Sequence, residues 1–153
     1  MTSNASAALH GLPFFEEFRA RHMDKLLTLG TEVQFAKDEV IFRENEEARL
    51  FYVILSGRVA LDAVVAGRTV RIQVLYAGED LGWSAVLSQA RQFQARALEP
   101  VKAMAFEIAT LRSACEANPY FGCAFFERMF TLVADRLQST REQLAAALVE
   151  SKK

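Results

Sequence analysis

The sequence has few of the residues that build metal sites or nucleic-acid-binding surfaces. Its only histidines, His10 and His22, precede the strand-rich segment in which a metal-binding barrel would carry its ligands. We therefore expect no metal site, and with no nucleophile–base pair in the barrel we expect no enzymatic activity. Lysine and arginine (18) nearly balance aspartate and glutamate (19), which argues against an overall basic field for nucleic acid or anionic lipid.

Cysteines and long apolar runs are also scarce. Cys115 and Cys123 are the only cysteines, in a segment that reads as helical, and their spacing puts them beyond disulfide reach within one helix. They are predicted to be buried free thiols in a reducing compartment. No apolar run reaches the ~18 residues typical of a membrane span, and the N-terminus lacks a signal-peptide pattern. A cytoplasmic protein without a membrane segment is predicted.

The chain does contain a β-rich middle flanked by helical patterns, which predicts one domain over residues 1–153. Apolar residues at helical spacing predict a helix over 12–29, with Pro13 in its first turn. Short runs of β-forming residues separated by turn residues predict an antiparallel barrel or sandwich over 32–107. These runs begin at Val33, Val40, Leu50, Arg58, Arg68, Gln94 and Val101.

Residues 108–150 are predicted to form a short helix and then a long final helix, with Asn118 and Pro119 as its N-cap and first-turn proline. Residues along the final helix recur at gaps of four and three, as in a heptad seam. The seam consists of Phe126, Phe130, Val133, Leu137, Thr140, Leu144 and Ala147. It packs either on its own domain or on a second copy, and apolar residues on flanking faces favour a homodimer. The hydroxyl of Thr140 is either a register device or a ligand contact.

Five segments in this order resemble the cyclic nucleotide-binding domain family, in the form of its catabolite-activator-type sensor domain. They are "GLPFFEEF", "IFRENEEARLFYVILSGRVAL", "AGEDLGW", "RQFQARA" and "RLQST". The resemblance extends from about Pro13 to Leu148. It implies an antiparallel β jelly-roll barrel with an N-terminal helix and a long C-terminal dimerisation helix. It also implies a phosphate-binding cassette, a loop and short helix that binds a cyclic nucleotide (cyclic AMP or cyclic GMP) or a related nucleotide.

The resemblance assigns ligand-binding roles within and beyond residues 78–97. Counting six places back from Ala97 identifies Arg91 as the phosphate-binding arginine, and a guanidinium suits that role because it can donate to two phosphate oxygens. Gly82 and Ser84 would add donors at the start of the cassette helix, and Thr140 would offer its hydroxyl to the purine. A solvated loop arginine and a glycine that serves only a tight turn are the alternatives.

The cassette also departs from the family pattern at three positions, Trp83, Gln92 and Phe93, the last of which stands where the family usually has an alanine. Trp83 stands where the family has a glutamate that accepts a hydrogen bond from the ribose 2′-hydroxyl, and an indole cannot accept one. This loss predicts about tenfold to over a hundredfold weaker binding of an ordinary cyclic nucleotide. Aligning Glu79 instead restores a glutamate but lengthens the gap to Arg91. Gln92 stands where the family has a small serine or threonine. Trp83 is interpreted either as a core residue or as a ring that stacks on a base or closes the pocket.

The combined interpretation is a stand-alone sensor that binds a nucleotide-type phosphate ligand and signals through the final helix of a homodimer. The chain ends at "VESKK", where transcription factors of the family continue into a winged helix-turn-helix, so no nucleic-acid binding is predicted. The alternative is a non-binding scaffold with a degenerate cassette that acts on an unknown protein partner. A DNA-binding regulator cut short is a third interpretation.

Overall fold

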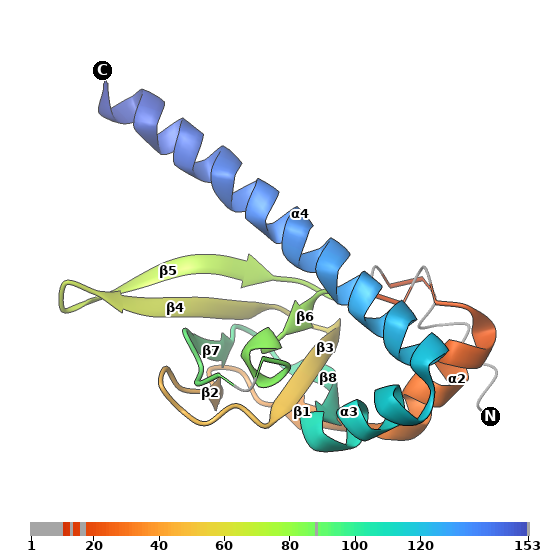
Figure 1. Cartoon of the computed structure of the whole chain (residues 1–153). Helices are drawn as coiled ribbons and strands as arrows, with labels where there is room; N and C mark the ends of the chain where they lie inside the picture. Colours follow the sequence, from red (N-terminus) through yellow and green to blue (C-terminus); the bar gives the residue numbers. More distant parts are fainter. Residues whose placement is uncertain (1–10, 13, 16–17, 88, 153) are drawn as a thin grey trace.

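The computed structural model describes residues 11–152 apart from 13, 16, 17 and 88. His10 and Pro13, which entered the sequence-based predictions, lie outside the described residues. Two β-sheets stack with helices gathered at one end, and a long C-terminal helix crosses the stack and projects beyond it (Figure 1). No helix among the described residues combines the length and the apolar character needed to cross a membrane.

The described elements are an N-terminal helix, eight strands interrupted by one helical turn, and two C-terminal helices. Their bounds are α2 (Ala20–Leu29), β1 (Gly30–Phe35), β2 (Val40–Phe42), β3 (Leu50–Ser56), β4 (Val59–Val65), β5 (Arg68–Leu75), β6 (Asp80–Leu81), η1 (Trp83–Ala85), β7 (Gln94–Ala97), β8 (Val101–Glu107), α3 (Ile108–Ala117) and α4 (Pro119–Ser151). The sheets have the strand orders β1-β8-β3-β6 and β2-β7-β4-β5, with antiparallel pairing throughout. The predicted β jelly roll is confirmed.

The N-terminal helix is shorter than the predicted 12–29, because α2 begins only at Ala20. Among the described residues before it, Phe14 and Phe15 lie in turns and Phe18 lies outside any regular element. All three rings are nevertheless buried in the core, where Phe14 packs on Phe15, Phe18 and Phe51. The helical spacing of these rings reflects burial rather than helix, a distinction that periodicity alone cannot make.

Strand β3 explains why the segment "FYVI" is apolar without interruption. Phe51 and Val53 belong to the hydrophobic cluster between the first sheet and the helices, whereas Tyr52 and Ile54 belong to the cluster between the two sheets. Alternate side chains of a strand point to opposite faces. A strand covered on both faces therefore reads as a continuous apolar run, and β3 is such a strand.

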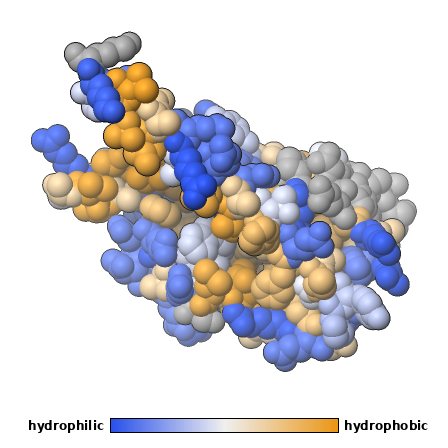
Figure 2. Space-filling model, turned by 45° about the horizontal axis from the view of Figure 1, so that its top comes forward, coloured by the Kyte–Doolittle hydropathy of each residue, from blue (hydrophilic) through white to orange (hydrophobic). Residues whose placement is uncertain are grey.

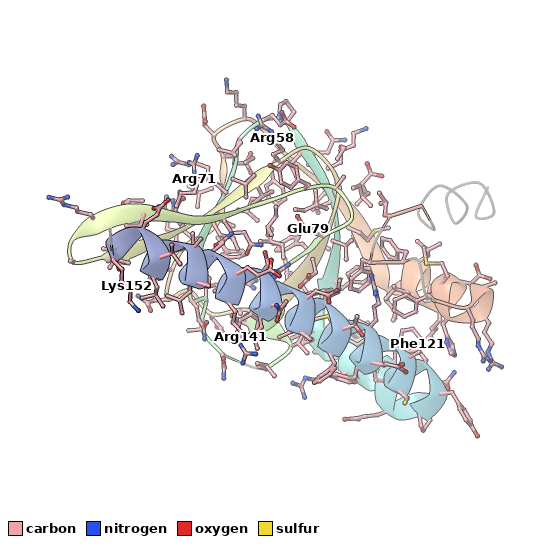
Figure 3. The ribbon with its side chains drawn as sticks, turned by 90° about the horizontal axis from the view of Figure 1, so that it is seen from above. Arg58, Arg71, Glu79, Phe121, Arg141 and Lys152 are labelled. Carbon is pink, nitrogen blue, oxygen red and sulfur yellow. The ribbon has the colours of Figure 1, made fainter. Side chains whose placement is uncertain are left out.

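The two C-terminal helices follow the prediction closely. The side chain of Asn118 caps α4, accepting a hydrogen bond from the backbone N–H of Phe121 at 3.3 Å, and Pro119 occupies the first turn. At 33 residues, α4 is about 50 Å long. Its buried residues all lie near its start: Phe121, Gly122, Phe125, Arg128 and Met129. Figure 3 shows the helix from above, running from Phe121 past Arg141 to Lys152.

The two cysteines lie in different helices, Cys115 in α3 and Cys123 in α4, and both are free thiols. Cys115 is half-buried, and burial raises the pKa of its thiol. Cys123 is exposed, so its predicted burial is wrong.

Candidate functional site

The predicted cassette lies between β6 and β7, with η1 as its short helix. Gly82 precedes η1 in the left-handed conformation, with φ of 88°. A Cβ atom at this position would lie 2.5 Å from Nη1 of Arg91 and 3.2 Å from the carbonyl oxygen of Leu50. Glycine is thus required both by the backbone conformation and by the close approach of Arg91.

Arg91 is buried, with 4% of its surface exposed, and its guanidinium is directed into the protein. Nη1 donates to the carbonyl oxygen of Gly82 at 3.0 Å, and Nη2 donates to that of Leu50 at 2.6 Å. The guanidinium carbon lies 4.1 Å from the centroid of the Phe42 ring, in cation–π geometry. These contacts fix the side chain against the strands of both sheets.

The positive charge of Arg91 has no anionic partner in the part of the chain that the structure describes. No carboxylate oxygen there lies within ion-pair distance, and Nε is buried without a hydrogen-bond acceptor. Burial lowers the pKa of Arg91, an effect opposed in part by Tyr52 and Glu46. A buried cation paired only with neutral carbonyls is electrostatically unsatisfied. This arrangement favours an anion at the site.

Directly beside Arg91 lies a small cavity, here called the inner cavity, of about 20 Å³. Its lining residues are Phe42, Leu61, Leu81, Gly82, Trp83, Ser84, Arg91, Gln92, Phe93 and Arg136. A volume of this size holds about one water molecule. In this conformation the inner cavity is therefore closed to a nucleotide.

A larger cavity of about 270 Å³, the outer cavity, adjoins the inner one between β4–β5, the cassette and α4. Five residues line both cavities: Leu61, Trp83, Gln92, Phe93 and Arg136. The outer cavity alone is also lined by Ile72, Gln73, Val133, Leu137 and Thr140. Movement of the shared side chains would join the two spaces into one of the size that binds small organic ligands.

All six residues predicted to bind a ligand lie at these two adjoining cavities. Gly82 and Ser84 line the inner cavity together with Arg91, Thr140 lines the outer cavity, and Trp83 and Gln92 line both. Glu79, the glutamate of the alternative alignment, lines neither. Its carboxylate instead accepts a hydrogen bond from the backbone N–H of Tyr76. The ligand-binding roles themselves stay predictions.

The cavities are also lined by residues that were not predicted, among them Phe42, Gln73 and Arg136. Phe42 reads in the sequence as an ordinary strand residue, and Gln73 lies opposite Leu61 in β5, on the same face as the buried Leu75. Arg136 lies four residues before Thr140 on α4, on the same helix face. The spacing between Arg136 and Thr140 is a signal from which Arg136 could have been inferred.

Two arginines hold the cassette from outside. Arg136 of α4 donates from Nη2 to Oδ1 of Asp80 at 2.8 Å and to the Asp80 carbonyl oxygen at 3.1 Å. Arg112 of α3 donates to the carbonyl oxygen of Val86, directly after η1. The strand that leads into the cassette is thus bonded to α4, and the cassette itself is bonded to α3 just after η1.

The described residues contain no group of three or more His, Cys, Asp or Glu side chains placed to hold a metal ion. Neither cavity is lined by an aspartate or glutamate among these residues. The site therefore offers one buried cation that shares the inner cavity with the Ser84 hydroxyl and with the rings of Trp83 and Phe93, and the Gln73 amide and Thr140 hydroxyl at the outer cavity.

Comparison with known proteins bears on this architecture. The sequence model of the cyclic nucleotide-binding domain matches residues 32–118. A search of curated proteins found no match.

Several solved structures share the fold. A cyclic nucleotide-binding domain from Methylobacillus flagellatus superposes with a TM-score of 0.83 at 16% identity, covering 92% of this chain and 80% of that one. The N-terminal domain of a transcriptional regulator from Streptomyces coelicolor gives 0.71 at 24% identity, covering 90% and 94%. The catabolite activator protein of Thermus thermophilus gives 0.73 at 20% identity, covering 88% of this chain and 62% of that one. Identities this low show the fold alone.

Proposed function

Because this chain belongs to the cyclic nucleotide-binding domain family, we propose that it is a regulatory sensor for a nucleotide-type phosphate ligand and signals through α4 of a homodimer. The proposed ligand is a cyclic nucleotide, cyclic AMP or cyclic GMP, or a related nucleotide. The two free cysteines fit the predicted cytoplasmic location, because thiols persist in a reducing compartment.

The observation that carries this proposal is the buried, unpaired charge of Arg91. A cyclic phosphodiester carries one negative charge, and a guanidinium can donate to two of its oxygens. Arg91 is held next to Gly82 and Ser84, so backbone and hydroxyl groups of the cassette lie beside the same cavity. An anion bound here would compensate a charge that the described residues leave without a carboxylate.

Binding requires the inner cavity to open, because about 20 Å³ cannot hold a phosphate group. Trp83, Gln92 and Phe93 line both cavities, and none of the three is fully buried. Their rearrangement would extend the outer cavity inward to Arg91. The phosphate would then meet Arg91 while the base occupies the outer cavity near Thr140.

The dimer is proposed from the exposed stripe of α4. Its apolar residues are not covered by the chain's own fold: Phe130 is 76% exposed and Leu144 is 58% exposed. Figure 2 shows hydrophobic side chains along the exposed part of this helix. A one-sided apolar stripe on a projecting helix is typical of a helix that pairs with another. We expect the stripe to pack on its counterpart in a second copy.

The proposal is tested by thermal unfolding and calorimetric titration with millimolar cyclic AMP and cyclic GMP. Ligand at a hundred times its dissociation constant stabilises by about 2.7 kcal/mol, which raises the midpoint by roughly 5 to 10 °C for a chain of this size. Arg91→Gln should abolish the shift. Arg43→Gln, which makes the same change at an exposed arginine next to Phe42, is the matched control and should preserve it.

A second candidate function is a scaffold that binds a protein partner and no small ligand. It is favoured by the two carbonyl oxygens that already accept from Arg91 and by the closed inner cavity. If neither nucleotide shifts the midpoint nor releases heat, the sensor proposal fails and the scaffold is favoured. A shift that survives in Arg91→Gln would place the ligand elsewhere.

A further inference from the structure

A third hollow, here called the lateral groove, lies between α4 and the turn of residues 76–79 that joins β5 to β6. Its volume of about 640 Å³ is within the range of cavities that bind small organic ligands. Figure 3 shows Glu79, which belongs to this turn, beside α4. The lateral groove shares Gln73 and Arg136 with the outer cavity, so these two side chains separate the two hollows.

Negative charge predominates in the lateral groove. Three carboxylates and two guanidinium groups line it, those of Glu79, Asp80, Asp135, Arg128 and Arg136. Both guanidinium groups are engaged, because Arg136 donates to Asp80 and Nε of Arg128 donates to a backbone carbonyl oxygen at 2.9 Å. Among the residues that the structure describes, Glu79 and Asp135 form no ion pair. The lateral groove therefore favours a cation.

Asp80 provides an independent reason to expect a positively charged ligand. The next residue of β6, Leu81, lines the inner cavity, so strand alternation directs Asp80 to the opposite face, toward α4 and the lateral groove. The Asp80 side chain is buried, and its Oδ2 has no hydrogen-bond partner in the part of the chain that the structure describes. A buried carboxylate oxygen without a donor is costly. A ligand that donates a hydrogen bond to Oδ2 would remove this cost.

Other groups of the lateral groove suit an organic cation. Tyr76 is 54% exposed, and its ring can contact an ammonium or guanidinium group in cation–π geometry. Leu132 is half-buried and offers apolar surface to an aliphatic chain. The Thr131 hydroxyl donates to the carbonyl oxygen of Glu127 at 3.0 Å, so toward a ligand it can only accept. An N–H donor on an aliphatic chain fits these three groups together.

We propose that the lateral groove is a second ligand site, which binds an organic cation carrying ammonium or guanidinium groups. The cation is either a free amine or a side chain of a partner protein, since both present the same chemistry. This site is separate from the proposed nucleotide site and does not depend on it. Asp135 lies nine residues before Leu144, half a turn away around α4, so pairing through the apolar stripe leaves this side of the helix uncovered.

Calorimetric titration of the unmodified protein in the absence of nucleotide tests the site. The probe is agmatine, which carries a guanidinium and an ammonium group on a four-carbon chain, and butane-1,4-diol is its uncharged counterpart. Agmatine should bind saturably and the diol should not. Agmatine binding should weaken as salt is added, because salt screens exposed carboxylates. Acetyl-arginine amide distinguishes the two sources: affinity equal to that of agmatine indicates a protein side chain, and weaker binding indicates a free amine.

Three isosteric substitutions remove the carboxylates one at a time. Asp135→Asn and Glu79→Gln should each weaken agmatine binding about two- to fivefold, the range for an exposed ion pair. Glu79→Gln keeps an acceptor for the backbone N–H of Tyr76. Asp80→Asn should weaken binding about 10- to 150-fold, the range for a hydrogen bond to a charged group. Glu142→Gln, at an exposed position of α4 outside the groove lining, is the matched control and should leave the affinity unchanged.

The outcomes separate a specific site from general attraction of cations. No saturable binding of agmatine below about 10 mM, or binding of the diol with equal affinity, would overturn the proposal. Unchanged affinity in both Asp135→Asn and Glu79→Gln would also overturn it, and these two variants decide the matter if Asp80→Asn does not fold. An equal loss in Glu142→Gln would show non-specific attraction and refute the site. Since no nucleotide is present, none of these results bears on the proposed sensor function.

Discussion

Replacing Arg136 with leucine should destabilise the fold, because it leaves Asp80 as a buried and unpaired carboxylate. Asp80 is only 1% exposed, and one of its oxygens, Oδ2, already has no hydrogen-bond partner in the described structure. Oδ1 accepts from Nη2 of Arg136 at 2.8 Å. This contact joins β6 to α4 across 56 residues of sequence.

The expected magnitude follows from burial. Removing one partner of a buried ion pair typically costs about 3 to 5 kcal/mol, because the remaining charge is left without compensation. For a chain of this size that cost corresponds to a midpoint lower by about 6 to 20 °C. Asp80→Leu should cost less, because Arg136 is partly exposed and can turn toward water. The double leucine variant should be more stable than Arg136→Leu alone.

Urea unfolding of the four proteins at one protein concentration measures this coupling as a double-mutant cycle. Arg141→Leu removes an exposed arginine from the same helix and should change the free energy of unfolding by less than about 0.5 kcal/mol. A loss below about 1 kcal/mol for Arg136→Leu, or additive effects in the cycle, would refute the reasoning. The pair would then behave like a solvated surface contact.

Two further predictions concern α2 and α4. Burial lowers the pKa of His22, with Arg21 and Arg19 adding to the effect, so the folded state holds this imidazole neutral more strongly than the unfolded state does. Its contribution to stability is therefore present above about pH 6.5 and lost as the pH falls below that value, by at most about 1.4 kcal/mol per pH unit. Between pH 7.5 and pH 5.5, urea unfolding should show a larger loss of unfolding free energy for the unmodified protein than for His22→Leu. An equal loss in both proteins would contradict this prediction. Leu144→Glu should convert the proposed dimer into a monomer because it places charge in the apolar stripe, whereas Gln143→Glu, one residue away, should not. Sedimentation should show about twice the 17.1 kDa chain mass for the unmodified protein, and a monomer there would rule out the proposed dimer.

The fold was predictable because its signals are local and mutually consistent. Alternation and turn residues marked seven of the strands, and Asn118 with Pro119 marked the start of α4. β6 was missed because two residues paired with β3 carry no periodic signal. The start of α2 was misplaced because Phe14, Phe15 and Phe18 are spaced as in a helix yet are buried from non-helical backbone.

The location of the candidate site was predictable, but its internal contacts were not. The position of Arg91 followed from spacing to a family pattern, whereas its bonds to Gly82 and Leu50 depend on how the cassette folds against β3. Ile72 could not be assigned to the outer cavity, because a bulge at this residue interrupts the strand alternation that places Gln73 and Leu75 on the inner face of β5. The closure of the inner cavity is likewise a property of packing rather than of any residue pattern.

The contacts of the cassette suggest how ligand binding would affect α4, the helix of the proposed dimer. A phosphate that recruits Arg91 competes with the carbonyl oxygens of Gly82 and Leu50, so the start of the cassette must shift relative to β3. Because Arg136 holds Asp80, such a shift would pull on α4, and we expect this contact to couple ligand binding to the position of α4. The part of α4 beyond residue 130 is about 30 Å long and packs little on its own chain. A tilt of about 10° at its base would therefore move its end by about 5 Å, enough to change which residues meet across a helix pair spaced by about 10 Å.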